Sequence, residues 1–129
     1  PDVLQDGEPV VFTEKIHGTW CQLGLVPDAA AGPHGPLVVS SKGLAAKGLA
    51  FVPDAPENAT NLYLRVARHL EIEPRIRRVF AEPLAAGRPA LILGEVFGAG
   101  VQDLSYGART EHDRSLGFRV FDIYLGWFG

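Results

Sequence analysis

The chain lacks methionine, has a single cysteine and contains no long apolar run. Because Cys21 has no second cysteine to pair with, an internal disulfide is excluded, which fits a reducing compartment. No stretch is apolar for long enough to cross a bilayer, and no secretory leader is visible. We therefore expect a cytoplasmic protein without membrane contact. The start at Pro1 and the missing methionine lead us to expect a fragment or a trimmed domain.

A surplus of positive charge is also lacking. The chain has 12 Lys and Arg against 15 Asp and Glu, which gives a net charge of −3. Non-specific binding of nucleic acid over the whole surface is therefore not expected. A local basic patch remains open, because five arginines lie close together in the sequence: Arg65, Arg68, Arg75, Arg77 and Arg78. They fit the solvated face of two helices better than a surface that faces RNA.

The apolar pattern predicts strands and helices in separate blocks. Alternating or β-branched runs predict strands over residues 10–13, 20–26, 37–40, 90–97 and 118–124. The first two would form a hairpin-like pair around a short connection that contains glycine. Loops are expected over residues 27–36, 42–47 and 98–115. This order favours an α+β fold with a largely antiparallel sheet, as one domain over residues 1–129.

Two helices are expected between the third and fourth of these strands. The first covers about residues 61–70, and Asn58 or Thr60 can cap its start. The second starts near Pro74 and ends at Gly87, with Pro83 shortening or kinking its last turn.

A lysine that follows the first predicted strand is the strongest candidate for chemistry. Lys15 lies between Glu14 and Ile16, with His17 and Gly18 directly after. A lysine amine becomes nucleophilic when desolvation or a nearby cation lowers its pKa. Gly18 would allow a ligand to approach closely. By itself, a lysine at the end of a strand is more often only solvated.

The segment Glu14-Lys15-Ile16-His17-Gly18-Thr19 resembles the first motif of the RNA ligase 2 family, and it contains the Lys-x-x-Gly signature of covalent nucleotidyltransferases. DNA ligases usually carry Asp at the position of His17, so the histidine favours an RNA ligase. The resemblance implies that Lys15 takes AMP covalently and that His17 lies within hydrogen-bonding reach of a phosphate. It also implies that Glu14 and Gly18 belong to the nucleotide site.

Two later segments resemble further motifs of the same family, in the family's order. Gly94-Glu95-Val96-Phe97-Gly98 is similar to the third motif, in which the glutamate binds the ribose hydroxyls. Residues 118–124 are similar to the motif whose aromatic residue stacks on adenine, which here would be Phe121. The alternatives are a solvated Glu95 and a Phe121 that belongs to the core.

Other parts of the chain show weaker similarities to the family, and some depart from its pattern. Lys42 lies where the family has a basic residue that contacts the nucleotide or the RNA end, although a lysine after a strand is common. Residues 36–52 look most like the Deinococcus-type branch. Trp20 stands where many relatives have Asn. The family's downstream metal-binding glutamate motif, its Lys-x-Lys motif and the additional small β-barrel domain of the Deinococcus-type enzymes have no counterpart.

The resemblance implies an incomplete nucleotidyltransferase domain that uses ATP and either Mg²⁺ or Mn²⁺. Its partners would be RNA ends, one with a 5′-phosphate and one with a 3′-hydroxyl. Two alternatives are a nucleotide-binding fragment without catalysis and a nucleotidyltransferase with another substrate, such as a DNA ligase or a capping enzyme. We expect no zinc site and assign no metal-ligating residue, because His34 and His112 lack ligand-like spacing to Cys21.

Overall fold

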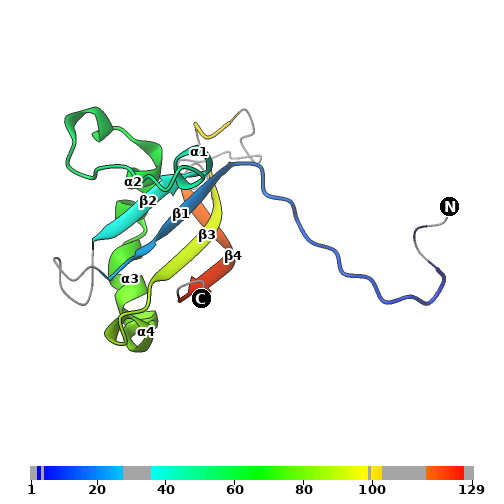
Figure 1. Ribbon diagram of the computed structural model, residues 1–129. Coiled ribbons are helices and arrows are strands. Elements are labelled where there is room, and N and C mark those ends of the chain that lie inside the picture. Colours follow the sequence, from blue (N-terminus) through cyan, green and yellow to red (C-terminus); the bar gives the residue numbers. More distant parts are fainter. Residues whose placement is uncertain (1–2, 4, 28–35, 99, 103–115, 127–129) are drawn as a thin grey trace.

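A four-stranded antiparallel sheet forms the centre of the molecule (Figure 1). The computed structural model describes residues 3, 5–27, 36–98, 100–102 and 116–126. Its strands are β1 (Thr19–Leu25), β2 (Leu37–Ser41), β3 (Ala90–Phe97) and β4 (Gly117–Leu125), in the spatial order β2-β1-β3-β4. The predicted α+β fold with an antiparallel sheet is therefore confirmed. So are the strands expected over residues 20–26, 37–40, 90–97 and 118–124, within a residue or two at their ends.

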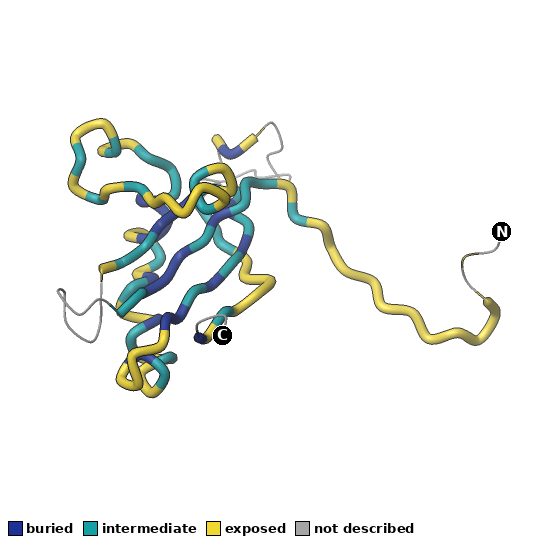
Figure 2. The backbone as a smooth tube through the Cα atoms, in the orientation of Figure 1, coloured by how far each residue is buried: buried dark blue, intermediate teal, exposed yellow. Residues whose placement is uncertain are grey.

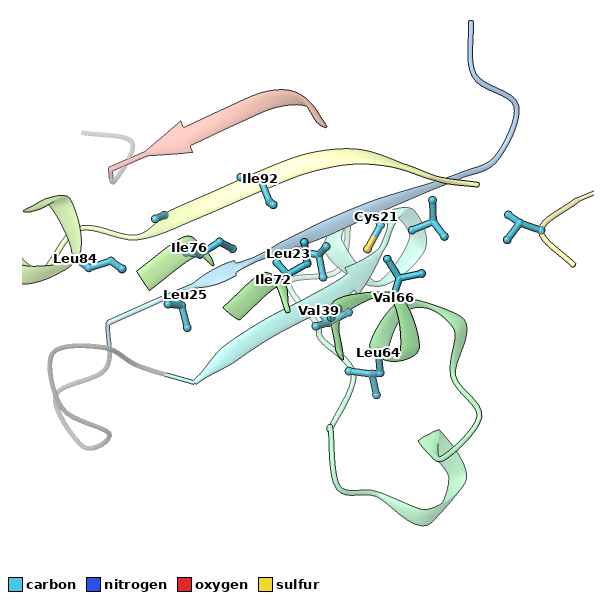
Figure 3. Packing of buried hydrophobic residues seen from close by; sticks show 14 residues of the cluster. Cys21, Leu23, Leu25, Val39, Leu64, Val66, Ile72, Ile76, Leu84 and Ile92 are labelled. Atoms are coloured by element: carbon cyan, nitrogen blue, oxygen red, sulfur yellow. The ribbon is translucent and has the colours of Figure 1, made fainter. Parts of the chain in front are cut away.

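The two main helices, α2 (Leu62–His69) and α3 (Ile72–Val79), cover one face of this sheet. The shorter helices are α1 (Lys42–Ala45), α4 (Ala81–Ala85) and the 3₁₀ turn η1 (Pro56–Asn58). Figure 3 shows the buried side chains of the strands, such as Leu23 and Val39, packed against Val66 of α2 and Ile76 of α3. This apolar layer supplies most of the stabilising burial.

The opposite face of the sheet is more open. Along β3 the buried residues Ala90, Ile92 and Val96 alternate with half-buried ones, since successive side chains point to opposite faces. Leu93 and Glu95 therefore lie on the open face. Figure 2 shows the contrast between the buried middle strands and the exposed edge strand β4.

A β-bulge interrupts the pairing of β3 with β4. Leu93 pairs with Asp122, but the next residue, Gly94, pairs with Val120. Phe121 is therefore the extra residue of β4, and such a residue locally re-aims the strand. Its side chain is 60% exposed, which excludes the alternative that Phe121 is a core aromatic.

The strand predicted over residues 10–13 is wrong. These residues run as an exposed chain that leads away from the sheet, and Phe12 is 91% exposed (Figure 1). A strand needs a neighbour that accepts its hydrogen bonds, and both sides of β1 are already occupied by β2 and β3. The expected hairpin-like pair is therefore replaced by a β1 that lies inside the sheet.

The loop predicted over residues 42–47 is also wrong, because α1 occupies its first part. The Ser41 side chain caps this helix by accepting a hydrogen bond from the Leu44 amide. Gly48 follows with a φ of 68°, and the Leu49 amide returns to the Leu44 carbonyl. The glycine thus ends a helix, as glycines in the left-handed region commonly do. Most of the loops predicted over residues 27–36 and 98–115 lies outside the described residues.

The two predicted helices are present with corrected ends. Asn61, rather than Asn58 or Thr60, caps α2 by accepting hydrogen bonds from two amides of the first turn. The second helix begins at Ile72 and is divided into α3 and α4 at Phe80. Pro83 lacks the N–H that a continuous helix would direct to the Val79 carbonyl, which explains the break.

Candidate functional site

A pocket of about 350 Å³ lies where the segment before β1 meets β3 and β4. Its lining comes from three parts of the chain that are distant in sequence: Glu14, Lys15, Ile16, Glu95, Arg119, Val120 and Phe121. Four predicted site residues, Glu14, Lys15, Glu95 and Phe121, thus meet in one place. The volume lies in the range of sites for small molecules, roughly 300–1,000 Å³.

The pairing of strands sets the polar part of this pocket. Trp20 of β1 and Arg119 of β4 both lie opposite Glu95 of β3, so the three residues form a row across the open face. The guanidinium carbon of Arg119 is 5.6 Å from the centroid of the Phe97 ring, which is cation–π geometry. Among the described residues, the Glu95 carboxylate has no hydrogen-bond or ion-pair partner. It is available to a ligand.

Lys15 reaches the pocket from outside the sheet. It is exposed, belongs to no strand and forms no ion pair with any described residue. A strand therefore does not hold its amine in place. The preceding Glu14 lines the same pocket, whereas the exposed His17 does not. Whether His17 reaches a bound phosphate stays a prediction.

Gly18 has a clear structural reason to be glycine. A Cβ atom there would lie 2.1 Å from the Val96 carbonyl oxygen of β3. No side chain fits at that separation, so glycine is what lets the start of β1 lie directly on β3. This contact is with the protein's own backbone, and the predicted role of Gly18 toward a ligand remains a prediction.

Lys42 is not among the residues that line this pocket. It is the exposed first residue of α1, directly after Ser41, which pairs with Cys21. This pairing places Lys42 at the same end of the sheet as Trp20. Lys42 follows β2, which lies on the other side of β1 from β3. Its contact with a nucleotide or an RNA end stays a prediction.

Arg119 is the site residue to which the sequence assigned no role. It stands inside the segment that resembles an adenine-stacking motif, but its relation to Glu95 depends on the register of two strands. The bulge at Phe121 shifts that register, and the sequence carries no clear signal for it. The position of Arg119 two residues before Phe121 is only a weak signal.

Cys21 is excluded as the nucleophile of this site. Its side chain is fully buried on the helix-covered face, and burial raises the pKa of the thiol from 9.0 to about 12. A thiol that stays protonated is a poor nucleophile.

Carboxylates of the pocket are the candidate ligands for a metal ion. Within the part of the chain that the structure describes, no three His, Cys, Asp or Glu side chains form a metal-binding group. Mg²⁺ commonly binds through one or two carboxylates together with substrate phosphates. Glu14, the pocket carboxylate that is not expected to bind the ribose, fits that mode. In the same described residues, no helix is long and apolar enough to cross a membrane.

Comparison with known proteins identifies the family. A family model described as RNA ligase matches residues 8–127, a range that includes every residue of the pocket. Comparisons with curated proteins and with solved structures gave no match. Since the match extends over nearly the whole chain and agrees with the pocket's position, the chain belongs to the RNA ligase family.

Proposed function

We propose that this chain is the adenylylating part of an ATP-dependent RNA ligase of the RNA ligase 2 type, with Lys15 as the nucleophile. The observation that carries the proposal is the single pocket that joins Lys15, Glu95 and Phe121. They come from three segments, and each would serve a different part of ATP. Membership of the RNA ligase family supports the reaction class.

In the first step, the neutral Lys15 amine attacks the α-phosphorus of ATP. A P–N bond forms, the bond to the bridging oxygen of pyrophosphate breaks, and pyrophosphate leaves with the electron pair. The amine releases its proton to solvent. Arg119 lies in the pocket as a fixed cation, and its guanidinium is suited to the oxygens of the transferring phosphoryl group. A bound Mg²⁺ or Mn²⁺ would supply further neutralisation of phosphate charge.

The other parts of ATP match the remaining lining of the pocket. The Glu95 carboxylate, which has no partner among the described residues, can accept hydrogen bonds from both ribose hydroxyls. The exposed Phe121 ring offers a flat apolar surface on which adenine can stack. Together these contacts would hold the nucleotide with its α-phosphate toward Lys15.

Two further transfers complete the proposed reaction. The 5′-phosphate of an RNA end attacks the lysyl-AMP, which releases Lys15 and joins AMP to the RNA through a pyrophosphate bond. A 3′-hydroxyl then attacks the activated phosphate, a phosphodiester bond forms, and AMP leaves. The partners are therefore RNA ends, and a panel of nicked RNA and nicked DNA distinguishes this reading from a DNA ligase.

The first test is covalent labelling by ATP that carries the label at its α-phosphate, in the presence of Mg²⁺ or Mn²⁺. We expect label that stays on the denatured chain and disappears in Lys15→Ala. Lys47→Ala is the matched control, since Lys47 is also an exposed lysine, lies outside the pocket and should retain the label.

Two other results would contradict the proposal in different ways. ATP binding that Glu95→Ala weakens, without any label, would identify a nucleotide-binding chain without catalysis. Label retained in Lys15→Ala would exclude Lys15 as the nucleophile.

A further inference from the structure

Two side chains from distant parts of the chain hold the backbone directly after the Lys15 segment. The Gln102 side-chain amide donates a hydrogen bond of 3.1 Å to the Gly18 carbonyl oxygen. The hydroxyls of Thr19 and Tyr63 are joined by a hydrogen bond of 2.9 Å. Both bonds attach at the point where the chain enters β1.

Tyr63 is itself held firmly. It lies in the first turn of α2, where its amide donates to the Asn61 side chain that caps the helix. Its ring is stacked on Phe51, with centroids 5.4 Å apart and planes inclined by 17°. The tyrosine hydroxyl is therefore presented to Thr19 by a side chain with little freedom to turn.

Gln102 adopts a backbone conformation that is unusual for its residue type. Its φ is 58°, in the left-handed region that residues other than glycine rarely occupy. The preceding Val101 is buried, and its amide donates to the Gly98 carbonyl. Such conformations persist where the surroundings hold them, and they often serve a site. Here the conformation directs the side-chain amide toward Gly18.

The position of Lys15 depends on this attachment. Residues 8–17 belong to no strand, so the first sheet pairing after Lys15 is that of Thr19 with Val96. Any tilt of the Gly18–Thr19 peptide would move the Lys15 amine relative to Glu95 and Phe121, which lie on β3 and β4. Two side-chain bonds, one from Gln102 and one from Tyr63, oppose that tilt.

We infer that Gln102 and Tyr63 are positioning residues, which fix the Gly18–Thr19 peptide and thereby aim the Lys15 amine into the pocket. The inference rests on the proposed function of Lys15. Neither residue lines the pocket, so both act through the backbone rather than on the nucleotide. They should therefore govern the rate of the covalent step and leave ATP affinity unchanged.

Two substitutions remove one bond each with little other change. Tyr63→Phe deletes only the hydroxyl and keeps the ring that stacks on Phe51. Gln102→Asn keeps an amide and a residue that tolerates the left-handed region, but it is one methylene too short to reach Gly18. Gln5→Asn is the matched control, because Gln5 is exposed and outside both attachments.

The experiment measures covalent labelling at a series of ATP concentrations, and backbone hydrogen exchange of residues 14–19 in the same variants. In Gln102→Asn and Tyr63→Phe we expect the limiting rate to fall by about ten-fold, since small misplacements of a reacting group are costly. The ATP concentration for half-maximal rate should stay the same, and exchange in residues 14–19 should become faster. Thermal unfolding should be unchanged.

The possible failures can be told apart. A higher half-maximal ATP concentration with an unchanged limiting rate would overturn the positioning role, as would unchanged exchange. If the wild-type chain takes no label at any ATP concentration, the proposed function itself fails. The positioning role in catalysis falls with it, even where exchange still responds to the substitutions.

Discussion

Among single residues, Arg119 is the one whose role follows most directly from its neighbours. It lies opposite Glu95, next to the Phe97 ring, and in the same pocket as Lys15. Its guanidinium offers a charge-assisted hydrogen-bonding partner to a phosphate group. Its function is therefore expected to depend on the charge of the ligand.

We predict that Arg119→Ala weakens binding of ATP but not of adenosine. The loss should be about ten-fold, which corresponds to ~1.4 kcal/mol for a charge-assisted contact that water partly screens. Titration calorimetry of both ligands measures this difference, with Arg119→Lys as an intermediate case. An equal loss for ATP and adenosine would place Arg119 at the base or sugar instead of the phosphates.

Among the elements, the contact of β1 with β3 is the one that the site depends on most. Gly18 brings the two strands together, and the same pairing sets Trp20 beside Glu95. The pocket can form only if the start of β1 lies against the end of β3. A side chain that separates the strands at Gly18 should therefore damage stability and the site together.

We predict that Gly18→Ala lowers the free energy of unfolding by about 1–3 kcal/mol, as overpacking does in other proteins. Gly43→Ala is the control: it lies in α1 with nothing within 4 Å of its added Cβ. Because alanine is the better helix former, Gly43→Ala should be neutral or stabilising by up to ~1 kcal/mol. Urea unfolding measures the free energy of unfolding of both variants. An equal change in the two variants would contradict the contact between Gly18 and the β3 backbone.

At the scale of the whole molecule, one buried apolar layer holds the sheet to its helices. Cys21 lies in this layer with no exposed surface, and burial raises the pKa of its thiol to about 12. In the unfolded chain the thiol ionises near the ordinary value of 9.0. Between these two values the folded state holds a proton that the unfolded state has lost, so stability falls as pH rises.

We predict that the wild-type chain loses stability between pH 8 and pH 10 by about 1 kcal/mol more than Cys21→Ala does. Below pH 8 the two pH profiles should run parallel, because the thiol is then neutral in both states. Chemical unfolding across this pH range measures the difference. Parallel profiles up to pH 10 would mean that the folded thiol is less buried than its position indicates.

The sequence by itself determined the four strands of the sheet and the two main helices, and it indicated the class of reaction. The apolar run over residues 90–97 predicted β3. The structure then showed that burial alternates along this strand, so that Glu95 lies on the face away from the core. The Lys15 segment and the residues around Phe121 indicate an RNA ligase from their sequence alone. The family match confirms that coarser assignment, while the individual roles of these residues remain predictions.

Only the tertiary structure decided which residues meet. The local apolar pattern favoured a strand over residues 10–13. This segment cannot pair with β1, because β2 and β3 already occupy both edges of β1. The bulge at Phe121 and the register that sets Arg119 opposite Glu95 arise from how β4 fits against β3. The bonds from Tyr63 and Gln102 span long stretches of chain. Strand edges, strand register and long-range hydrogen bonds depend on residues that are distant in sequence. A local sequence pattern therefore does not predict these features.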